Sequence, residues 1–426
     1  MRFKTWALGL TLAGTALLSA CGGGGDGGNT TSIRLLNATR SYGSLDLAVD
    51  DKSVNSNVSY AAVGSYASVS TTDTAAQVQT SGVGTSVAAL TLGLSAGSHY
   101  TLIAYGWSGA VRTSLLQEAE EAPASGKSKL LVLNLAPDAG ALDVFLSVVG
   151  DSVDNESAVA TAVAGGSSSG YKTINSGSYR VRITGTGKKA DLRLDIPTIG
   201  LSSAGVSTLI ITANEGGVLV NGILLAQKGS TTNFASTESR VRVVAAVADS
   251  AMVSALLNGN TLLGTSVAPT IGEYQSFAAG AGTLSVMVNG NPLEVSAPTL
   301  KAGADYTLLV WGDTASPQLT VMSDDNRLPS TAGTVKMRLV NGVASLNTGL
   351  TLSVDYSAIA TNVTPGTAST PAVISASTKS LLSVSSPTSG TPVYEIAELP
   401  LVANGIYSVF LLGGADKMVG TLRRER

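Results

Sequence analysis

Side chains suited to acid–base, thiol and zinc chemistry are scarce in this sequence. Its 426 residues include one histidine, His99, and one cysteine, Cys21. A zinc site needs several His or Cys ligands, and a Ser-His-Asp triad needs a histidine held beside the serine. His99 lies just before a predicted strand, where we expect a surface residue at the strand edge. The sequence therefore predicts no catalytic histidine, no metal site and no cofactor site.

Charge is scarce as well. Charged residues make up 13% of the chain and the formal net charge is −3, whereas about 25% of a typical domain is charged. Nucleic-acid binding needs a clustered basic surface that displaces counterions. The one basic cluster is Arg423-Arg424-Glu425-Arg426, which we expect to be a solvated tail that frays. No nucleic-acid partner is predicted.

Carboxylate pairs are the remaining candidates for chemistry. Asp50-Asp51 and Asp324-Asp325 lie in a predicted turn and loop, where solvated acidic residues are common. Calcium binding there is conceivable because it needs only oxygen ligands, although neither stretch has the spacing of an EF-hand. A glycosidase would need two carboxylates in one cleft, about 5–9 Å apart. The sequence identifies no such pair, so a carboxylate-dependent enzyme is kept as the alternative function.

The N-terminal residues have the pattern of an export signal. Arg2 and Lys4 precede the apolar stretch 6–18, which is too short to span a bilayer, and the stretch ends in Leu18-Ser19-Ala20-Cys21. This ending resembles the lipobox of bacterial lipoproteins, whereas a plain secretory signal with a chance cysteine is the alternative. The resemblance implies a signal peptide at 1–20, and a Cys21 that carries a diacylglycerol and an acylated amino group. Two or more chains anchor a protein stably in a membrane.

The lipobox is followed by a glycine-rich segment. We interpret residues 21–32 as a flexible tether. The glycine run is no phosphate loop, because it lacks a preceding strand, a following helix and a Lys-Ser/Thr pair. Gly22 rather than an aspartate follows Cys21, and by resemblance to Gram-negative lipoproteins this implies the outer membrane, with the body in the periplasm or on the surface.

The rest of the chain is repetitive. The stretch Gly97–Gly106 returns as Gly303–Gly312, as Gly405–Gly413 and, more weakly, as Gly205–Ala213. Each copy has a turn glycine, an aromatic or hydroxyl residue and a short apolar strand. The period is about 100 residues, far longer than that of solenoid repeats. We therefore predict an all-β protein of tandem immunoglobulin-like β-sandwiches at 33–126, 127–232, 233–331 and 332–426, called units one to four below.

Units one, three and four have the residues of a tyrosine corner, in which a tyrosine hydroxyl forms a hydrogen bond with upstream backbone at the edge of a sandwich. A leucine stands six residues before Tyr100, Tyr306 and Tyr407. Unit two has Ser207 at this position, so its corner should be weaker or absent.

Other strands follow from the alternation of apolar and polar residues. Opening strands are predicted at 33–38, 130–136, 241–246 and 335–341, and second strands at 45–49, 142–146 and 352–356, with Asp143 pointing away from the core. Arg34, Arg242 and Arg338 alternate with apolar neighbours, which is typical of half-buried strands.

Turn residues predict several connections. Asn258-Gly259 and Asn289-Gly290 suit tight hairpin turns. Asn214–Gly217 and Asn221-Gly222 break the apolar stretch 209–225 into hairpins, which excludes a transmembrane helix. A short helical turn is expected at 114–122, and a long loop with an embedded strand at 380–384 is expected over 364–392.

The opening strands and the repeated stretch together resemble the bacterial domain-of-unknown-function family DUF4397. Unit two carries the resemblance best, with Asn134-Leu135-Ala136-Pro137-Asp138-Ala139-Gly140-Ala141-Leu142-Asp143-Val144 and Ser176–Val181. Units one and three keep Gly-x-Tyr at Gly64–Tyr66 and Gly272–Tyr274, and the resemblance would cover nearly all of the mature chain. It implies a β-sandwich on exported proteins with no assigned activity and no catalytic residue.

These features predict a lipid-anchored cell-envelope protein whose tandem sandwiches are a non-enzymatic binding or spacer module. Tyr105, Trp107 and Trp311 are candidates for an aromatic platform that binds a glycan or a protein chain. Trp311 occupies the position of Tyr105 in its copy, which favours a packing role. A glycosidase-like enzyme and a purely structural stalk are the alternatives.

Overall fold

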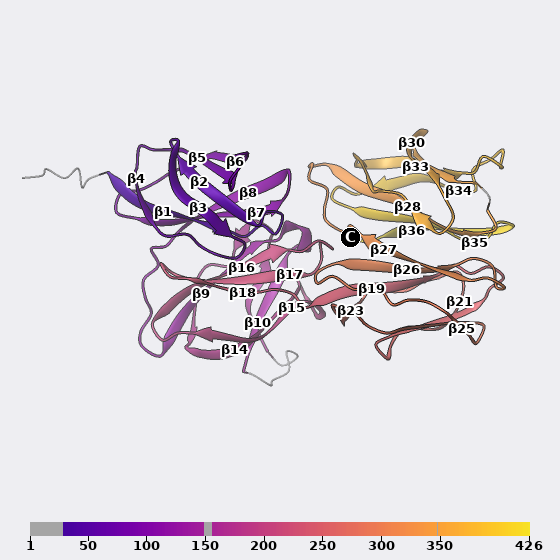
Figure 1. Cartoon of the computed structure of the whole chain (residues 1–426), viewed down its shortest axis with the longest axis horizontal. Coiled ribbons are helices and arrows are strands. Elements are labelled where there is room, and N and C mark those ends of the chain that lie inside the picture. The colour runs from indigo at the N-terminus through magenta and orange to yellow at the C-terminus, as the bar shows by residue number, and fades with distance from the viewer. Residues whose placement is uncertain (1–28, 149–155, 347) are drawn as a thin grey trace, which may run out of the picture.

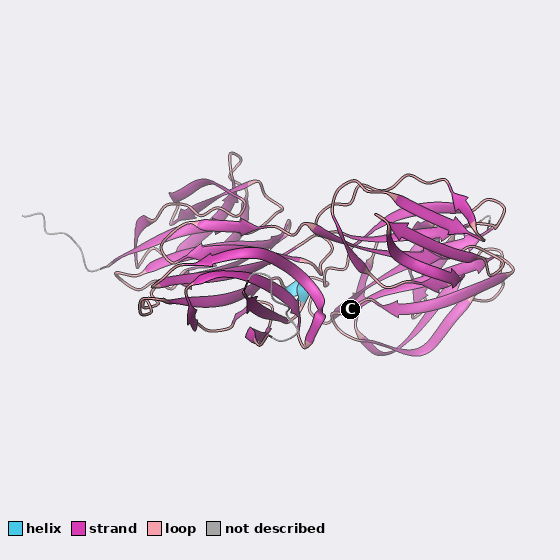
Figure 2. Cartoon of the chain, turned by 90° about the horizontal axis from the view of Figure 1, so that it is seen from below, coloured by secondary structure: helices cyan, strands magenta, loops and turns pink. Residues whose placement is uncertain are grey.

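The computed structural model describes residues 29–148, 156–346 and 348–426. The predicted signal peptide, Cys21 and most of the predicted tether lie outside these residues. Among the described residues, the one helical element is the short 3-10 helix η1 (Pro137–Ala139), and all other regular elements are strands (Figure 2). No helix in the described ranges is long and apolar enough to cross a membrane. The predicted all-β class of tandem immunoglobulin-like β-sandwiches is confirmed.

Within the described residues the strands form eight sheets, two in each repeat. The first sheet of unit one contains β1 (Thr30–Asn37), β4 (Ala67–Ser70), β7 (His99–Trp107) and β8 (Ala110–Gln117), and the second contains β2 (Ser44–Val49), β3 (Lys52–Ser59), β5 (Ala75–Thr80) and β6 (Ser86–Thr91). The first sheet of unit two contains β9 (Lys127–Leu135), β12 (Ser167–Ser168), β13 (Lys172–Asn175), β16 (Gly205–Ala213), β17 (Val220–Ala226) and β18 (Thr231–Phe234), and the second contains β10 (Leu142–Ser147), β11 (Ala158–Val163), β14 (Gly177–Gly185) and β15 (Lys188–Leu201).

Units three and four repeat this arrangement. The first sheet of unit three contains β19 (Glu238–Ala245), β22 (Thr270–Ile271), β23 (Gln275–Ala278), β26 (Asp305–Trp311) and β27 (Gln318–Asp324), and the second contains β20 (Met252–Leu257), β21 (Asn260–Val267), β24 (Leu284–Val288) and β25 (Asn291–Leu293). The first sheet of unit four contains β28 (Thr334–Ala344), β31 (Thr367–Ala368), β32 (Ala372–Ser375), β35 (Ile406–Gly414) and β36 (Lys417–Arg424), and the second contains β29 (Leu350–Val354), β30 (Ser357–Val363), β33 (Ser377–Ser385) and β34 (Tyr394–Leu401).

The sequence repeat is a repeat of strand pairing. In every unit the opening strand lies parallel to the strand of the repeated stretch, as β1 with β7, β9 with β16, β19 with β26 and β28 with β35. The register is conserved between units, because an apolar residue of the opening strand faces the first aromatic or hydroxyl residue of its partner. These pairs are Ile33 with Tyr100, Leu130 with Ser207, Val241 with Tyr306 and Met337 with Tyr407.

Each unit has an apolar core between its two sheets. Ile33, Leu130, Val241 and Val335 from the opening strands all belong to these cores and are almost completely buried. Removing such side chains from water is the main contribution to the stability of a sandwich. The other face of each opening strand is also apolar, which a sheet with one solvated face would not need.

That second face is buried between units. Leu36 and Ile103 of unit one pack with Ile210 and Ile223 of unit two. Val244 and Leu309 of unit three pack with Val340 and Phe410 of unit four in the same way. The units are therefore not arranged in a single row. They form two pairs, with units one and two in one half and units three and four in the other (Figure 1).

The tyrosine corners are confirmed in three units. The hydroxyl oxygen accepts a hydrogen bond from the backbone N–H of the residue five positions upstream. The pairs are Ser95 with Tyr100 at 3.1 Å, Lys301 with Tyr306 at 3.1 Å, and Val402 with Tyr407 at 3.0 Å. Unit two has Ser207 in this place, which cannot supply a ring at the edge of the sandwich.

The hairpin predictions are confirmed where Asn-Gly connects two strands. Asn258-Gly259 joins β20 to β21 and Asn289-Gly290 joins β24 to β25, with positive φ at all four residues. Residues 214–219 separate β16 from β17 as expected, but Asn221-Gly222 lies inside β17. The second predicted break is wrong, because Gly222 sits against Ile196 and Leu194 in a place with little room for a side chain.

Two further predictions are wrong. Residues 114–117 belong to strand β8, so the helical turn at 114–122 is absent. The long loop predicted over 364–392 is replaced by β31, β32 and β33, because this segment pairs with the opening strand and with β29. The embedded strand predicted at 380–384 is confirmed as part of β33. Asp143 points away from the apolar cluster, as predicted, although its side chain is only 8% exposed. Its carboxylate accepts hydrogen bonds from the backbone N–H groups of Ala162 and Gly187 at 2.7 and 2.8 Å.

Candidate functional site

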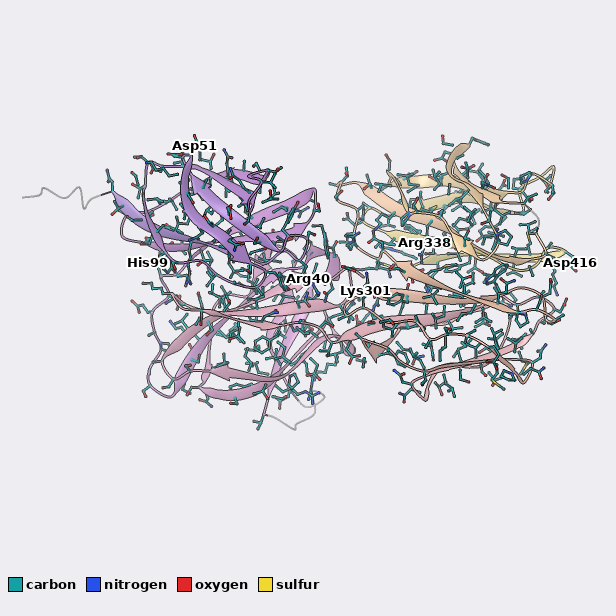
Figure 3. All side chains as sticks on the ribbon, in the orientation of Figure 1. Arg40, Asp51, His99, Lys301, Arg338 and Asp416 are labelled. Carbon is teal, nitrogen blue, oxygen red and sulfur yellow. The ribbon has the colours of Figure 1, made fainter. Side chains whose placement is uncertain are left out.

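Buried arginines are the main polar feature of the faces between paired units. Arg34, Arg242 and Arg338 occupy the same place in three opening strands and are 4%, 0% and 6% exposed. They point away from the cores and into the interface with the neighbouring unit (Figure 3 labels Arg338). A guanidinium withdrawn from water must be paired and hydrogen-bonded, so its partners show how the units are held.

Arg34 of unit one is held by a short chain of polar side chains. Its Nε donates to Thr101 Oγ1 at 2.9 Å and its Nη2 donates to Glu118 Oε1 at 2.9 Å. The hydroxyl of Tyr66 donates to the same oxygen of Glu118 at 2.7 Å, and the guanidinium lies 4.3 Å from the centre of the Tyr66 ring. The Nη1 of Arg34 then crosses to unit two, where it donates to the carbonyl of Gly229 at 2.7 Å.

Unit three repeats this arrangement closely. Arg242 Nε donates to Thr307 Oγ1 at 2.9 Å, and both Thr307 and the Tyr274 hydroxyl donate to Asp324 Oδ2 at 2.5 Å. The guanidinium lies 4.3 Å from the centre of the Tyr274 ring. Burial raises the pKa of Tyr274, and the charge of Asp324 raises it further. The phenol therefore stays protonated and remains a donor.

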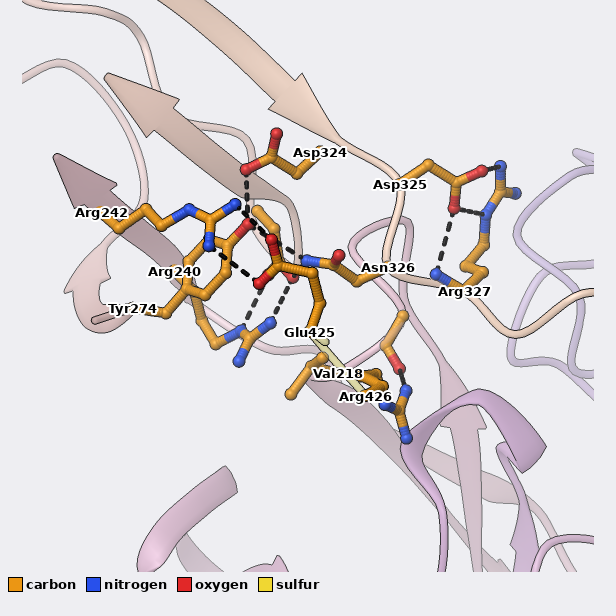
Figure 4. A network of polar contacts seen from close by, with 12 residues as sticks. Val218, Arg240, Arg242, Tyr274, Asp324, Asp325, Asn326, Arg327, Glu425 and Arg426 are labelled. Carbon is orange, nitrogen blue, oxygen red and sulfur yellow. Dashed lines mark hydrogen bonds and ion pairs between the residues drawn. The ribbon is translucent and has the colours of Figure 1, made fainter. Parts of the chain in front are cut away.

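Units three and four exchange their charged partners. Arg242 of unit three binds Glu425 of unit four through two hydrogen bonds of 2.8 and 2.7 Å. Arg338 of unit four pairs with Asp324 of unit three at 2.7 Å. Asp324 is the last residue of β27 and Glu425 follows β36, at the same register, so the two ion pairs are equivalent contacts made in opposite directions. Figure 4 shows the pair of Arg242 with Glu425. This exchange locks the second pair of sandwiches together.

The basic segment 423–426 is therefore docked, and the expectation of a solvated, frayed tail is wrong. The side chain of Glu425 is 2% exposed, and Arg423 pairs with Glu273 of unit three at 2.5 Å. Arg426 Nη1 donates to the carbonyl of Gly217 in unit two at 3.0 Å. The C-terminus consequently lies where the two halves meet (Figure 1).

The two halves also meet around Asp138. Its carboxylate accepts a hydrogen bond from Trp107 Nε1 at 2.9 Å and another from the backbone N–H of Leu328 at 3.0 Å. Arg327 lies over the Trp107 ring at 4.8 Å from its centre. Trp107 of unit one is thus covered by the segment that leads into unit four, and a cavity of about 280 Å³ remains beside it and Tyr105.

The other predicted aromatic residues pack between units. Tyr105 is 8% exposed in the apolar interface of units one and two, and Trp311 contributes to the interface of units three and four. Trp311 Nε1 donates to Thr320 Oγ1 at 3.0 Å. The equivalent places of Tyr105 and Trp311 support the packing role that their sequence positions favoured.

The other residues that the sequence singled out are scattered. The rings of His99 and Tyr66 meet edge to face with centres 5.0 Å apart. Asp50 and Asp51 form a turn at positive φ, in which Asp50 Oδ1 accepts from the Ala75 backbone N–H at 2.9 Å. The backbone carbonyl of His99 also accepts a hydrogen bond at 2.8 Å from the N–H of Glu118, the residue that pairs with Arg34.

The Asp324-Asp325 pair is not the solvated pair that its sequence indicated. Asp324 is 2% exposed, and Asp325 is paired with Arg327 and Lys336, each at 2.8 Å. Both carboxylates are therefore neutralised by cations of the chain itself. In the described part of the chain no group of three or more His, Cys, Asp or Glu side chains is placed to hold a metal ion.

A cleft of about 510 Å³ separates units two and three and is a candidate for a binding site. Edge strand β15 of unit two forms one wall, and the start of β19 with edge strand β23 of unit three forms the other. Asp191, Arg193, Asp195, Glu238 and Arg240 line it. Pockets between domains are the usual place for ligands.

The base of this cleft is rigid. Arg240 Nε donates to Asp305 Oδ1 at 2.9 Å, and Asn326 Nδ2 donates to Asp305 Oδ2 at 2.7 Å. Asp305 is completely buried beside the junction, where the N–H of Gly216 donates to the carbonyl of Gly303 at 2.9 Å. Unit two and unit three are therefore fixed against each other where the cleft begins.

Glu238 is the acidic residue of the cleft that lacks a cationic partner. Within the described chain its carboxylate makes no ion pair, whereas Asp191 pairs with Arg193 and Asp195 pairs with Arg180. Burial raises the pKa of Glu238, and the nearby charge of Asp195 raises it further. A raised pKa in a cleft is a common sign of a functional position.

Sequence reasoning missed the cleft residues because each lies in an ordinary strand pattern. Asp191, Arg193 and Asp195 alternate along β15, which indicates only a solvated strand face. One available signal was the recurrence of arginine in three opening strands. A charge repeated in an apolar strand indicates a buried pair, since an unpaired one would be too costly.

The model of the family described as domain of unknown function (DUF4397) matches residues 31–145 and 239–349. These two regions are more than half of the chain and agree with tandem copies. The first match ends after the Asn134–Val144 motif, so most of unit two, which was expected to carry the resemblance best, lies outside both. Among curated proteins, none matches the chain.

Several solved structures are similar at low identity. A candidate cell adhesion protein from Bacteroides uniformis is 13% identical over 47% of this chain and 98% of that chain, with a TM-score of 0.22. A candidate cell adhesion protein from Bacteroides ovatus is 11% identical over 48% and 98%, with a TM-score of 0.21. The TIE protein of Bacillus anthracis is 10% identical over 92% and 68%, with a TM-score of 0.15. Likeness at these scores carries no argument about function.

Proposed function

This chain belongs to the DUF4397 family, and from that premise we propose that it is a lipid-anchored protein of the bacterial cell envelope. Its four sandwiches act as a binding module that catalyses no reaction and that also holds its ligand away from the membrane. The proposed anchor is Cys21, and the proposed location is the outer membrane, with the body in the periplasm or on the surface.

One observation carries the non-enzymatic part of this proposal. The most deeply buried ionisable side chains of the described chain are used to hold sandwiches together. Arg242 with Glu425 and Arg338 with Asp324 span one interface, and Arg240 with Asp305 is an ion pair within unit three, beside the junction between the halves. Groups fixed in such pairs are unsuited to exchanging protons with a substrate. The polar residues thus give the protein a fixed shape.

A second candidate function is a carboxylate-dependent enzyme such as a glycosidase. The observation that favours it is that Glu238 and Asp195 line one cleft and that Asp195 contributes to the raised pKa of Glu238. A retaining or inverting glycosidase uses one protonated and one ionised carboxyl in this way. Product analysis after incubation with oligosaccharides distinguishes this candidate, because a binding module leaves them intact.

The anchor is tested by expressing the full-length chain in a Gram-negative bacterium and separating its membranes. We expect the wild-type protein in the outer-membrane fraction, with an N-terminal peptide whose mass includes acyl chains on Cys21. Cys21→Ser should release the protein from the membrane, whereas Gly24→Ser in the predicted tether should not. An unacylated wild-type protein outside the membrane fraction would overturn the proposal.

A further inference from the structure

The cleft between units two and three has free polar groups of a particular kind. The carboxylate of Glu238 lacks an ion-pair partner, and the side chains of Thr237 and Ser276 are exposed at the rim. Within the described residues neither of these two hydroxyl groups makes a hydrogen bond. A ligand in the cleft would therefore meet one acceptor-rich carboxyl and two hydroxyls, each able to donate and accept.

The remaining charges in the cleft are already neutralised. Arg193 binds Asp191 at 2.5 Å and Arg240 binds Asp305, while Asp195 binds Arg180 through an Nε–Oδ1 hydrogen bond of 2.8 Å. An anionic ligand would approach three carboxylates without finding a free cation. A strongly cationic ligand would have to lie beside two guanidinium groups. The pairing therefore disfavours a fully charged ligand of either sign.

The cleft also offers apolar surface between the polar groups. Leu192 is 38% exposed and Pro197 is exposed, and both lie on the β15 wall. Saccharides present hydroxyl groups around an apolar ring face, so they can use both kinds of surface at once. The volume of about 510 Å³ lies within the range of about 300–1,000 Å³ that is usual for small-molecule sites.

We propose that this cleft binds a neutral saccharide, with Glu238 and Ser276 accepting and donating hydrogen bonds to its hydroxyl groups. The inference rests on the proposed binding function and adds to it the site and the class of ligand. The walls come from two units that are joined at the base of the cleft by the Gly216–Gly303 hydrogen bond, beside the Arg240–Asp305 pair of unit three. A site that is already formed loses less entropy when a ligand binds.

The experiment uses the full-length chain in detergent micelles on an array of neutral, amino and acidic oligosaccharides. Titration calorimetry with the neutral oligosaccharide that binds best then compares variants. Ser276→Trp fills the rim and Glu238→Leu removes the carboxyl, and each should weaken binding at least tenfold. The matched controls are Thr261→Trp, at an exposed strand position outside the cleft, and Glu398→Leu, at an exposed carboxylate of unit four. Both should bind like wild type.

The outcomes separate this inference from the proposed function. No neutral oligosaccharide bound, only charged sugars bound, or full affinity in Ser276→Trp would each overturn the saccharide cleft while leaving the anchored, non-enzymatic module standing. Shortening of a bound oligosaccharide that depends on Glu238 would overturn the non-enzymatic function while supporting the ligand class. A misfolded variant is recognised by its circular dichroism, and Glu238→Gln then takes its place.

Discussion

Arg242 of unit three and Glu425 of unit four form a buried ion pair, with hydrogen bonds of 2.8 and 2.7 Å between guanidinium and carboxylate. The equivalent pair, Arg338 with Asp324, runs in the opposite direction across the same interface at 2.7 Å. Units three and four each supply an arginine that pairs with a carboxylate of the other unit. If the units separated, all four charged side chains would lose their partners. The two ion pairs therefore hold units three and four together within the fold.

The tyrosine corner should make a measurable contribution to stability. Tyr306→Phe removes the oxygen that accepts the Lys301 N–H, and leaving a backbone donor without its partner costs about 1–2 kcal/mol. We expect a lower denaturation midpoint in urea. Tyr356→Phe is the control, because Tyr356 is 89% exposed, and it should unfold like the wild type. Equal midpoints for both variants would show that the corner hydroxyl contributes nothing.

Substitutions at two glycines with the same φ distinguish the cost of a strained backbone from the cost of disturbed packing between units. Gly333 and Gly366 both have φ of +74°, but a Cβ at Gly333 meets nothing within 4 Å, whereas one at Gly366 would overlap the ring of Trp311. Gly333→Ala should cost about 1–2 kcal/mol for the left-handed conformation. Gly366→Ala should cost about 1–3 kcal/mol more, because Trp311 must move.

Thermal unfolding of the two glycine variants checks this prediction. The melting temperature of Gly366→Ala should lie clearly below that of Gly333→Ala. If the two variants melt together, the close contact of unit four with Trp311 is not present in solution.

Stability at acid pH should depend on Asp325. Burial opposes its ionisation, but hydrogen bonds and charges from Arg327 and Lys336 outweigh this and lower its pKa to about 2. A carboxyl with a lowered folded-state pKa stabilises the fold above its unfolded-state pKa of about 4. That contribution is lost as the pH falls from about 4 to about 2.

Urea unfolding between pH 2 and pH 6 measures the effect. Asp325→Asn should be less stable than wild type at pH 6 and should lose less stability on acidification. Asp249→Asn, at an exposed turn, should follow the wild-type pH dependence. Parallel curves for Asp325→Asn and wild type would contradict the role of this ion pair.

Local patterns predicted the secondary structure well and the assembly poorly. The opening strands, the Asn258-Gly259 turn and the tyrosine corners depend on neighbouring residues, and all are found in the structure. The burial of Arg242 depends on Glu425, which is 183 residues away in the sequence. No local pattern contains such a contact. Because of such contacts, the segment 423–426, which was expected to be a solvated tail, is part of an interface.

The candidate site was hidden for the same reason. Glu238 begins a strand and Asp195 lies in the middle of another, and each looks like an ordinary solvated residue by itself. The cleft exists because units two and three meet at a fixed angle, which the Gly216–Gly303 contact helps to set. A single sequence contains the residues of the cleft but gives no sign that they face one another.

The central claim is that buried charges exchanged between units three and four hold these two sandwiches together, and a charge-reversal cycle at Arg242 and Glu425 tests it most directly. Arg242→Glu and Glu425→Arg should each lower the free energy of unfolding by about 3–5 kcal/mol, because each places like charges together in a buried interface. The double variant restores an opposite pair, so it should be clearly more stable than the sum of the two losses allows. Strictly additive losses in urea unfolding would contradict the account.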